Sequence, residues 1–125
     1  MLAYTTIGVS DFERAKSFYE ALLAVIGAQY LLGNERIALY GHEVTNPMLA
    51  VCIPYDEGEP SAGNGTMVAI RAGGPAECDA MYQKAMELGA TCDGPPGERS
   101  PGFFYGGYVR DPDGNKLCFC QIGPQ

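Results

Sequence analysis

Residues 108–120 read Tyr-Val-Arg-Asp-Pro-Asp-Gly-Asn-Lys-Leu-Cys-Phe-Cys, and this stretch decides the fold of the second half of the chain. Its central Asp-Pro-Asp-Gly-Asn run is dense in turn formers, because proline presets φ and glycine supplies a positive φ. An Asp-Gly pair between alternating residues is a strong hairpin signal. After the turn, alternation places Leu117 and Phe119 on one face and Cys118 and Cys120 on the other. The stretch therefore predicts a hairpin with one apolar face and one thiol-bearing face.

The composition is that of a folded, acidic protein. The 125 residues are 46% hydrophobic and 18% charged, with a net charge of -7, which predicts one domain over 1–125 with a real core. The acidity argues against nucleic acid and anionic membranes as partners. No apolar run reaches the length of a membrane span, and no signal-peptide pattern opens the chain. Because the five cysteines are an odd number without repeated spacing, we expect reduced thiols and a cytoplasmic location.

Working outward from the hairpin, the same order of elements occurs twice. The first half predicts strands at 4–9, 28–32, 36–40 and 48–53, with a helix between a capping sequence at 10–13 and Gly27. The second half predicts strands at 66–72, 90–93, 104–110 and 115–122, with a helix between Pro75 and Gly89. Residues 55–65 are acidic and rich in Gly and Pro, as in a linker. The modules are therefore about 1–60 and 64–122.

Superposing the two halves supports an internal repeat. Tyr4 is laid on Met67, and Ile7 then falls on Ile70. Laying the final strands together puts Leu49 on Cys118 and Val51 on Cys120. Each module has one helix and one small sheet, which is too little to stand alone. We expect the core to contain these apolar residues: Ile7, Phe18, Leu22, Ile70, Met81, Leu117 and Phe119.

The chain resembles the vicinal-oxygen-chelate superfamily, which includes glyoxalase I, extradiol dioxygenases and the bleomycin and fosfomycin resistance proteins. The resemblance lies in the segments at 7–11 and 15–19, the Gly-Asn-Gly-Thr sequence at 63–66, and the motif at 108–115. It implies an α+β fold of two βαβββ modules whose mixed sheets form a cup, usually within a homodimer. It also implies a small-molecule ligand.

In the superfamily's enzymes, four inward positions carry His or Glu ligands to a divalent metal. The resemblance places these positions at Tyr4, Leu49, Met67 and Cys118, none of which is His or Glu. Imidazole and carboxylate suit such ions, whereas this set does not. We therefore expect no metal cofactor. The alternative is a divalent Ni, Zn, Mn or Fe ion held in another way.

Further residues are candidates for the ligand pocket, each with a simpler structural interpretation. Cys118 and Cys120, with Met67, are either a soft Cu(I)-type site or apolar filler, and filler is favoured. Arg71 either grips a carboxylate or phosphate or extends to water. Tyr4 either donates a hydrogen bond to a ligand or plugs the cup. Tyr108 closes the glycine-rich aromatic stretch at 97–108, which is either a lid over a ligand or a turn and bulged strand.

These observations leave three functional hypotheses. The favoured one is a metal-free binding protein whose cup holds a small molecule. The alternative is a lactoylglutathione-lyase-like enzyme or another metal-dependent member of the superfamily, so the sequence leaves enzymatic activity open. The third is a non-catalytic dimerising scaffold. His42, the only histidine, lies in a predicted loop beside Glu43, and a surface position is favoured over a catalytic one.

Overall fold

The computed structural model describes residues 1–124, which divide into two compact units, with the boundary between Ala62 and Gly63. The first unit contains β1 (Tyr4–Gly8), α1 (Phe12–Ala24), β2 (Gln29–Gly33), β3 (Ile37–Gly41) and β4 (Met48–Cys52). The second contains β5 (Val68–Arg71), α2 (Pro75–Glu87), β6 (Thr91–Ser100), β7 (Phe104–Arg110) and β8 (Lys116–Ile122). Each unit is therefore a βαβββ module, as the repeat predicted.

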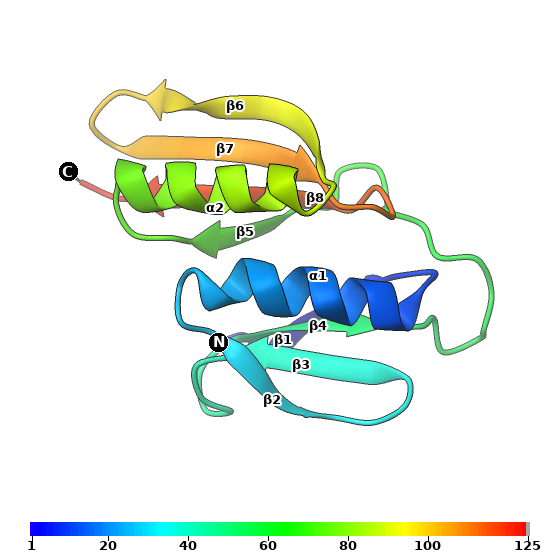
Figure 1. The fold of residues 1–125 in the computed structure, drawn as a ribbon. Helices are drawn as coiled ribbons and strands as arrows, with labels where there is room; N and C mark the ends of the chain where they lie inside the picture. The colour runs from blue at the N-terminus through cyan, green and yellow to red at the C-terminus, as the bar shows by residue number, and fades with distance from the viewer. Residues whose placement is uncertain (125) are drawn as a thin grey trace. The chain divides into compact units, whose positions relative to one another are not determined.

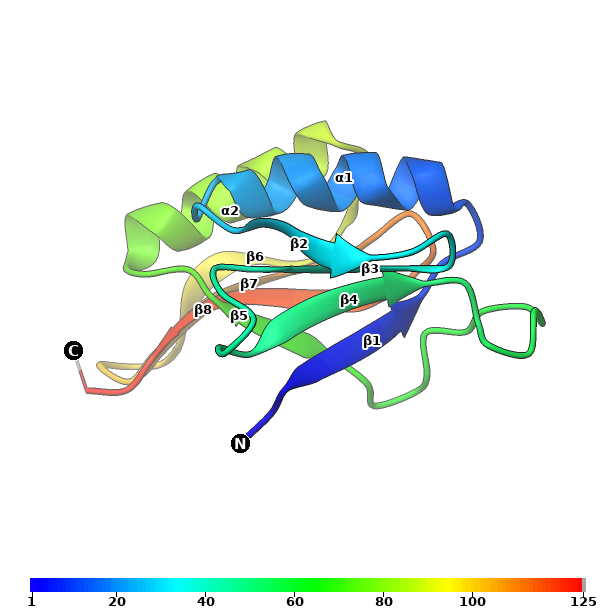
Figure 2. The same ribbon diagram turned by 90° about the horizontal axis from the view of Figure 1, so that it is seen from below.

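Each unit has one four-stranded mixed sheet with a helix on one face (Figures 1 and 2). The strand order is β1-β4-β3-β2 in the first sheet and β5-β8-β7-β6 in the second. In both sheets the first strand pairs in parallel with the last, and the other pairs are antiparallel. The architecture is α+β, and this prediction is confirmed.

The two helices end in the same way, which strengthens the repeat. The Ala28 amide donates to the Leu23 carbonyl at 3.0 Å, and the Ala90 amide donates to the Ala85 carbonyl at 3.0 Å. Both bonds require the preceding glycine to adopt a positive φ, which is 76° at Gly27 and 103° at the glycine before Ala90. The start of α1 differs slightly from the prediction, because the side chain of Asp11, rather than Ser10, caps the helix.

The apolar stripes of the helices pack against the sheets. Phe18 and Leu22 of α1 are buried, as is Met81 of α2. Of the seven residues predicted to form the core, six are buried and Ile70 is half-buried. No helix among residues 1–124 is long and apolar enough to cross a membrane.

The strand β6 is longer than predicted, because it continues through Pro95 and Pro96 to Ser100. It is an edge strand of its sheet, where a residue without a backbone N–H is tolerated. The register with β7 shifts at three places, so the extra residues are absorbed by bulges. Residues 97–108 therefore form two paired strands and a short turn at 101–103, which is the second of the two interpretations of that stretch.

The turn between β7 and β8 is held by the buried carboxylate of Asp111. Its Oδ1 accepts hydrogen bonds from the backbone amides of Asp113 at 2.9 Å and Asn115 at 2.8 Å. Its Oδ2 accepts from the Asn115 side-chain amide at 3.0 Å. Gly114 has a φ of 89°, as the turn requires. The predicted hairpin is confirmed, and Arg110 pairs with Lys116 at its end.

We predict that Asp111→Ala lowers the free energy of unfolding by roughly 2–4 kcal/mol, because it leaves buried donors without their charged acceptor. Urea denaturation followed by circular dichroism measures this. The matched control is Asp56→Ala, which removes an exposed carboxylate that accepts a hydrogen bond from the Gly58 amide at 2.9 Å. A loss at Asp111 no greater than that at Asp56 would contradict the structural role of this turn.

Candidate ligand-binding site

The face of each sheet that lies away from its helix carries all of the candidate site residues except Leu49; we call it the helix-free face. In the first unit, the Tyr40 hydroxyl donates to Glu20 of α1 at 3.1 Å, so Tyr40 lies on the helix side. Burial and the nearby Glu20 charge raise the pKa of Tyr40. Tyr40 pairs with Leu49, and paired residues share a face. Leu49 therefore also lies on the helix side.

This placement corrects the predicted position of Leu49. Leu49 pairs with Thr5, whereas Tyr4 pairs with Met48 and Thr6 pairs with Ala50. Leu49 thus lies on the opposite face from Tyr4, although the superposition of the sequences put both on the inward face. The physical reason is that side chains alternate along a strand, so a slip of one residue exchanges the two faces.

Equivalent hydrogen bonds in the two units give the correct superposition. The Val9 amide donates to the Cys52 carbonyl at 2.9 Å, and the Ala72 amide donates to the Cys120 carbonyl at 3.0 Å. Cys52 therefore corresponds to Cys120, and Ala50 to Cys118. The same bonds make Tyr4 equivalent to Met67, and Ile7 equivalent to Ile70, as predicted. Only the final strand of the first unit was misaligned.

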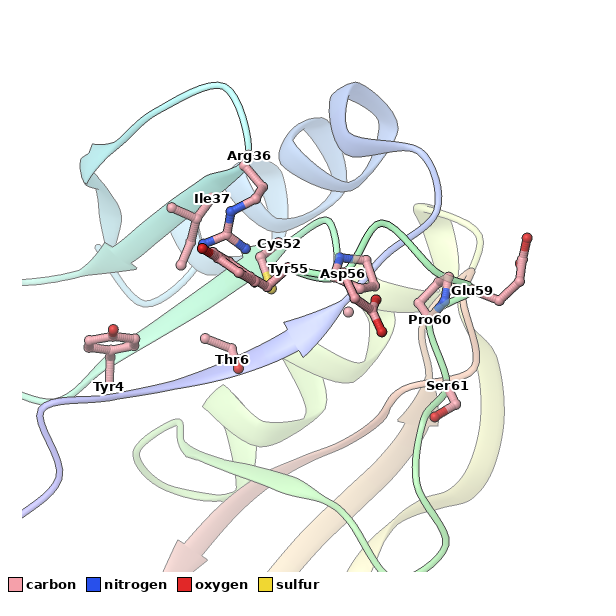
Figure 3. Close-up of a pocket in the computed structure, with 12 residues that line it drawn as sticks. Tyr4, Thr6, Arg36, Ile37, Cys52, Tyr55, Asp56, Glu59, Pro60 and Ser61 are labelled. Atoms are coloured by element: carbon pink, nitrogen blue, oxygen red, sulfur yellow. The ribbon is translucent and has the colours of Figure 1, made fainter.

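The helix-free face of the first unit contains an open cavity of about 460 Å³ (Figure 3). Tyr4, Thr6 and Gly8 of β1 line it, together with Cys52 at the end of β4. Arg36, Ile37 and residues 54–56 and 59–61 form the rest of the wall. This volume falls within the range of small-molecule pockets. Tyr4 is 50% exposed and so is available to a ligand.

A guanidinium–aromatic pair forms one side of this cavity. The guanidinium carbon of Arg36 lies 5.3 Å from the centre of the Tyr55 ring, and Arg36 Nη1 donates to the Ile53 carbonyl at 3.0 Å. Tyr55 is 87% exposed, so most of its ring is open to contact. In Figure 3 the side chain of Glu59 extends away from this pair. The cavity thus offers an aromatic surface with a cation at its edge.

The helix-free face of the second unit carries most of the other predicted site residues. Cys118 pairs with Tyr108 and with Ala69, so these three share a face, and alternation adds Cys120 and Arg71. Met67 precedes β5 on the same alternation and is 42% exposed. Lys116 and Arg99 each place a cation 5.3 Å from the centre of the Tyr108 ring. The face is therefore cationic around a central tyrosine.

The thiols on this face are shielded from solvent. Burial raises the pKa of Cys118 to about 12, and the neighbouring Cys120 adds to the shift. Burial also raises the pKa of Cys120. Both groups are therefore neutral thiols at physiological pH, which is the state of inert rather than nucleophilic cysteines.

The residues at the four inward positions do not fit a divalent metal of the Ni, Zn, Mn or Fe class. In the corrected superposition these positions hold Tyr4, Ala50, Met67 and Cys118, which offer one phenol, one thioether and one thiol. Within residues 1–124, no group of three or more His, Cys, Asp and Glu side chains is placed to hold a metal ion. His42 is exposed in the loop after β3.

Several residues of these faces were not identified from the sequence. Arg36 and Tyr55 of the cavity gave no signal, because a strand-end arginine and a linker tyrosine are ordinary surface residues in sequence. Arg99 was also missed, since it lies beyond the predicted end of its strand. The alternation that carries Met67 did identify Arg71, and the glycine-rich aromatic stretch identified Tyr108; the structure brings both onto one face.

Comparisons with known proteins agree with this geometry. The family model described as Glyoxalase/Bleomycin resistance protein/Dioxygenase superfamily matches residues 1–119. The crystal structure of a glyoxalase/bleomycin resistance protein from Albidiferax ferrireducens T118 is 32% identical, with a TM-score of 0.88, over 98% of this chain and 99% of that chain. The chain belongs to the Glyoxalase/Bleomycin resistance protein/Dioxygenase superfamily.

More distant structures share the fold. Lactoylglutathione lyase from Agrobacterium tumefaciens is 21% identical, with a TM-score of 0.66, over 96% of this chain and 91% of that chain. The fosfomycin resistance protein FosX from Mesorhizobium loti is 20% identical, with a TM-score of 0.70, over 98% and 92% of the two chains. The search of curated proteins found no match.

We predict that only one of the five thiols reacts rapidly with Ellman's reagent in the native protein at pH 8. That thiol is Cys92, which is exposed, whereas Cys52, Cys78, Cys118 and Cys120 are buried. Burial also raises the pKa of Cys78 to about 11. A thiol loses its proton only as the pH approaches its pKa. The raised pKa values of Cys78, Cys118 and Cys120 therefore leave little thiolate at pH 8. Cys92→Ser removes the rapid phase, and a second rapid thiol in that variant would contradict the structure.

Proposed function

We propose that this protein binds a small organic molecule in the cavity on the helix-free face of its first unit, without a metal ion. The observation that carries the proposal is the combination of an open cavity of about 460 Å³ with inward positions that lack His and Glu. The chain keeps the scaffold of the superfamily, but the positions that carry His and Glu metal ligands in its enzymes hold other residues here.

The chemistry of the cavity favours a ligand with a flat apolar part and a polar edge. Tyr4 and Tyr55 offer ring faces, and Ile37 adds an aliphatic surface. The Arg36 guanidinium uses one of its five N–H donors on the Ile53 carbonyl, so it can also donate to a ligand. Thr6 adds a hydroxyl at the floor. Such a mixture of apolar surface with a few polar groups is typical of small-molecule sites.

The proposal includes a homodimer that acts in the cytoplasm. Each sheet has two edge strands, and small sheets with open edges gain from a partner that covers them. Four of the five cysteines are buried as free thiols, which suits a reducing compartment.

A thermal-shift screen of small aromatic acids, amides and alcohols tests the binding function. We predict that compounds bound in the cavity raise the melting temperature, since binding to the native state alone stabilises it. Thr6→Phe fills the cavity floor and abolishes these shifts. The control is Thr5→Phe, which adds the same ring on the other face of β1 and preserves them. Shifts that survive in Thr6→Phe would contradict this location.

Elemental analysis of protein purified without an affinity tag tests the absence of a metal. We predict less than about 0.1 equivalent of Ni, Zn, Mn or Fe per chain, because the inward positions lack suitable donors. Chelation with EDTA then leaves the melting temperature unchanged. One equivalent of metal, lost on chelation together with lyase activity on the methylglyoxal–glutathione adduct, would instead favour the enzymatic alternative.

A further inference from the structure

Two arginines on the helix-free face of the second unit lack carboxylate partners among residues 1–124. Arg71 Nη1 donates to the Ile122 carbonyl at 3.1 Å, and Arg99 Nη2 donates to the Pro95 carbonyl. Both side chains are exposed. The other cations of this face differ, because Arg110 and Lys116 both contact Asp93, at 3.1 and 3.4 Å. The positive charges of Arg71 and Arg99 therefore remain available to a ligand.

The register places these two guanidiniums at opposite ends of one row across the sheet. Arg71 pairs with Cys120, Cys120 pairs with Gly106, and Gly106 pairs with Gly97. Three strand spacings separate the Cα atoms of the end residues by about 14 Å. The guanidinium of Arg99 lies over the far end, since a Cβ on Gly97 would be 2.9 Å from Arg99 Nη1.

The residues between the two arginines are small or aromatic. Cys120 carries a neutral thiol, and Gly106 has no side chain. The Phe104 ring lies beside Gly106, because a Cβ there would be 2.9 Å from the ring. A side chain at Gly106 would therefore have to displace the Phe104 ring. The row therefore combines an uncharged middle with a cation at each end.

We propose that this row binds an elongated organic dianion, with one carboxylate or phosphate group at Arg71 and the other at Arg99. Guanidinium forms paired, charge-assisted hydrogen bonds with both kinds of group. The half-buried Phe104 ring contacts the apolar body between the two charges. In a chain with a net charge of -7, two free guanidiniums on one face select for such a ligand against the field of the whole protein.

Titration of ¹⁵N-labelled protein with suberate tests this inference, since suberate carries a carboxylate at each end of an aliphatic chain. Octanoate, with one carboxylate, and 1,8-octanediol, with none, are the comparison compounds. We expect chemical-shift changes centred on the amides of Gly97, Gly106 and Cys120. We also expect suberate to bind about tenfold more tightly than octanoate, as one further charged contact allows.

Arg71→Gln and Arg99→Gln each reduce the affinity for suberate about tenfold, to the level of octanoate. Lys84→Gln is the matched control, because it removes the same charge from α2 in the same unit and changes the affinity less than about twofold. The amide spectra of the variants verify their folding. Equal shifts with octanediol, or wild-type affinity in either arginine variant, would overturn the proposal.

The two binding sites are tested by different variants. Thr6→Phe addresses the cavity of the first unit, whereas the arginine variants address the row in the second. Failure of suberate to bind at the row would therefore refute this inference and leave the proposed function standing. If no compound in the screen raised the melting temperature while suberate still bound, the proposed function would be refuted and this inference would stand.

Discussion

The parallel pairing of the first and last strands in each unit is the constraint on which the rest of the structure depends. It brings β4 between β1 and β3, and β8 between β5 and β7, so the last strand of each unit lies in the interior of its sheet. A parallel pair requires a crossover connection, and in each unit this connection contains the helix. The helix covers one face of its sheet (Figure 2). The pairing thereby determines which face is covered by a helix and which is free.

The chemistry of the free face follows from this arrangement. In β8, the apolar residues Leu117 and Phe119 point toward the helix side, and the free face receives Cys118 and Cys120. In the first unit the corresponding residues are Ala50 and Cys52, and Cys52 lines the cavity beside β1. The two units thus present different surfaces on one scaffold: a cavity with a guanidinium–aromatic edge, and a cationic face around Tyr108.

Membership of the superfamily and the chemistry of the site are separate questions, because a fold can host several functions. The match over residues 1–119 and the 32% identical structure show the family. The proposal of binding in place of metal-assisted catalysis rests on the residues at the inward positions, since Met67 and Cys118 are soft or neutral donors. The structures of the lyase and the fosfomycin resistance protein, at 21% and 20% identity, show only that the fold is shared.

The sequence by itself determined the order of the elements, the hairpin at 111–115 and the face of the two cysteines. These features depend on local rules: turn residues, helix-ending glycines and the alternation of side chains along a strand. Only the tertiary structure decided that Ala50, and not Leu49, corresponds to Cys118, because register depends on hydrogen bonds between strands distant in sequence. It alone placed Arg36 beside Tyr55, and extended β6 so that Arg99 lies over Gly97. Such contacts join segments whose separation in the chain carries no signal of their proximity in space.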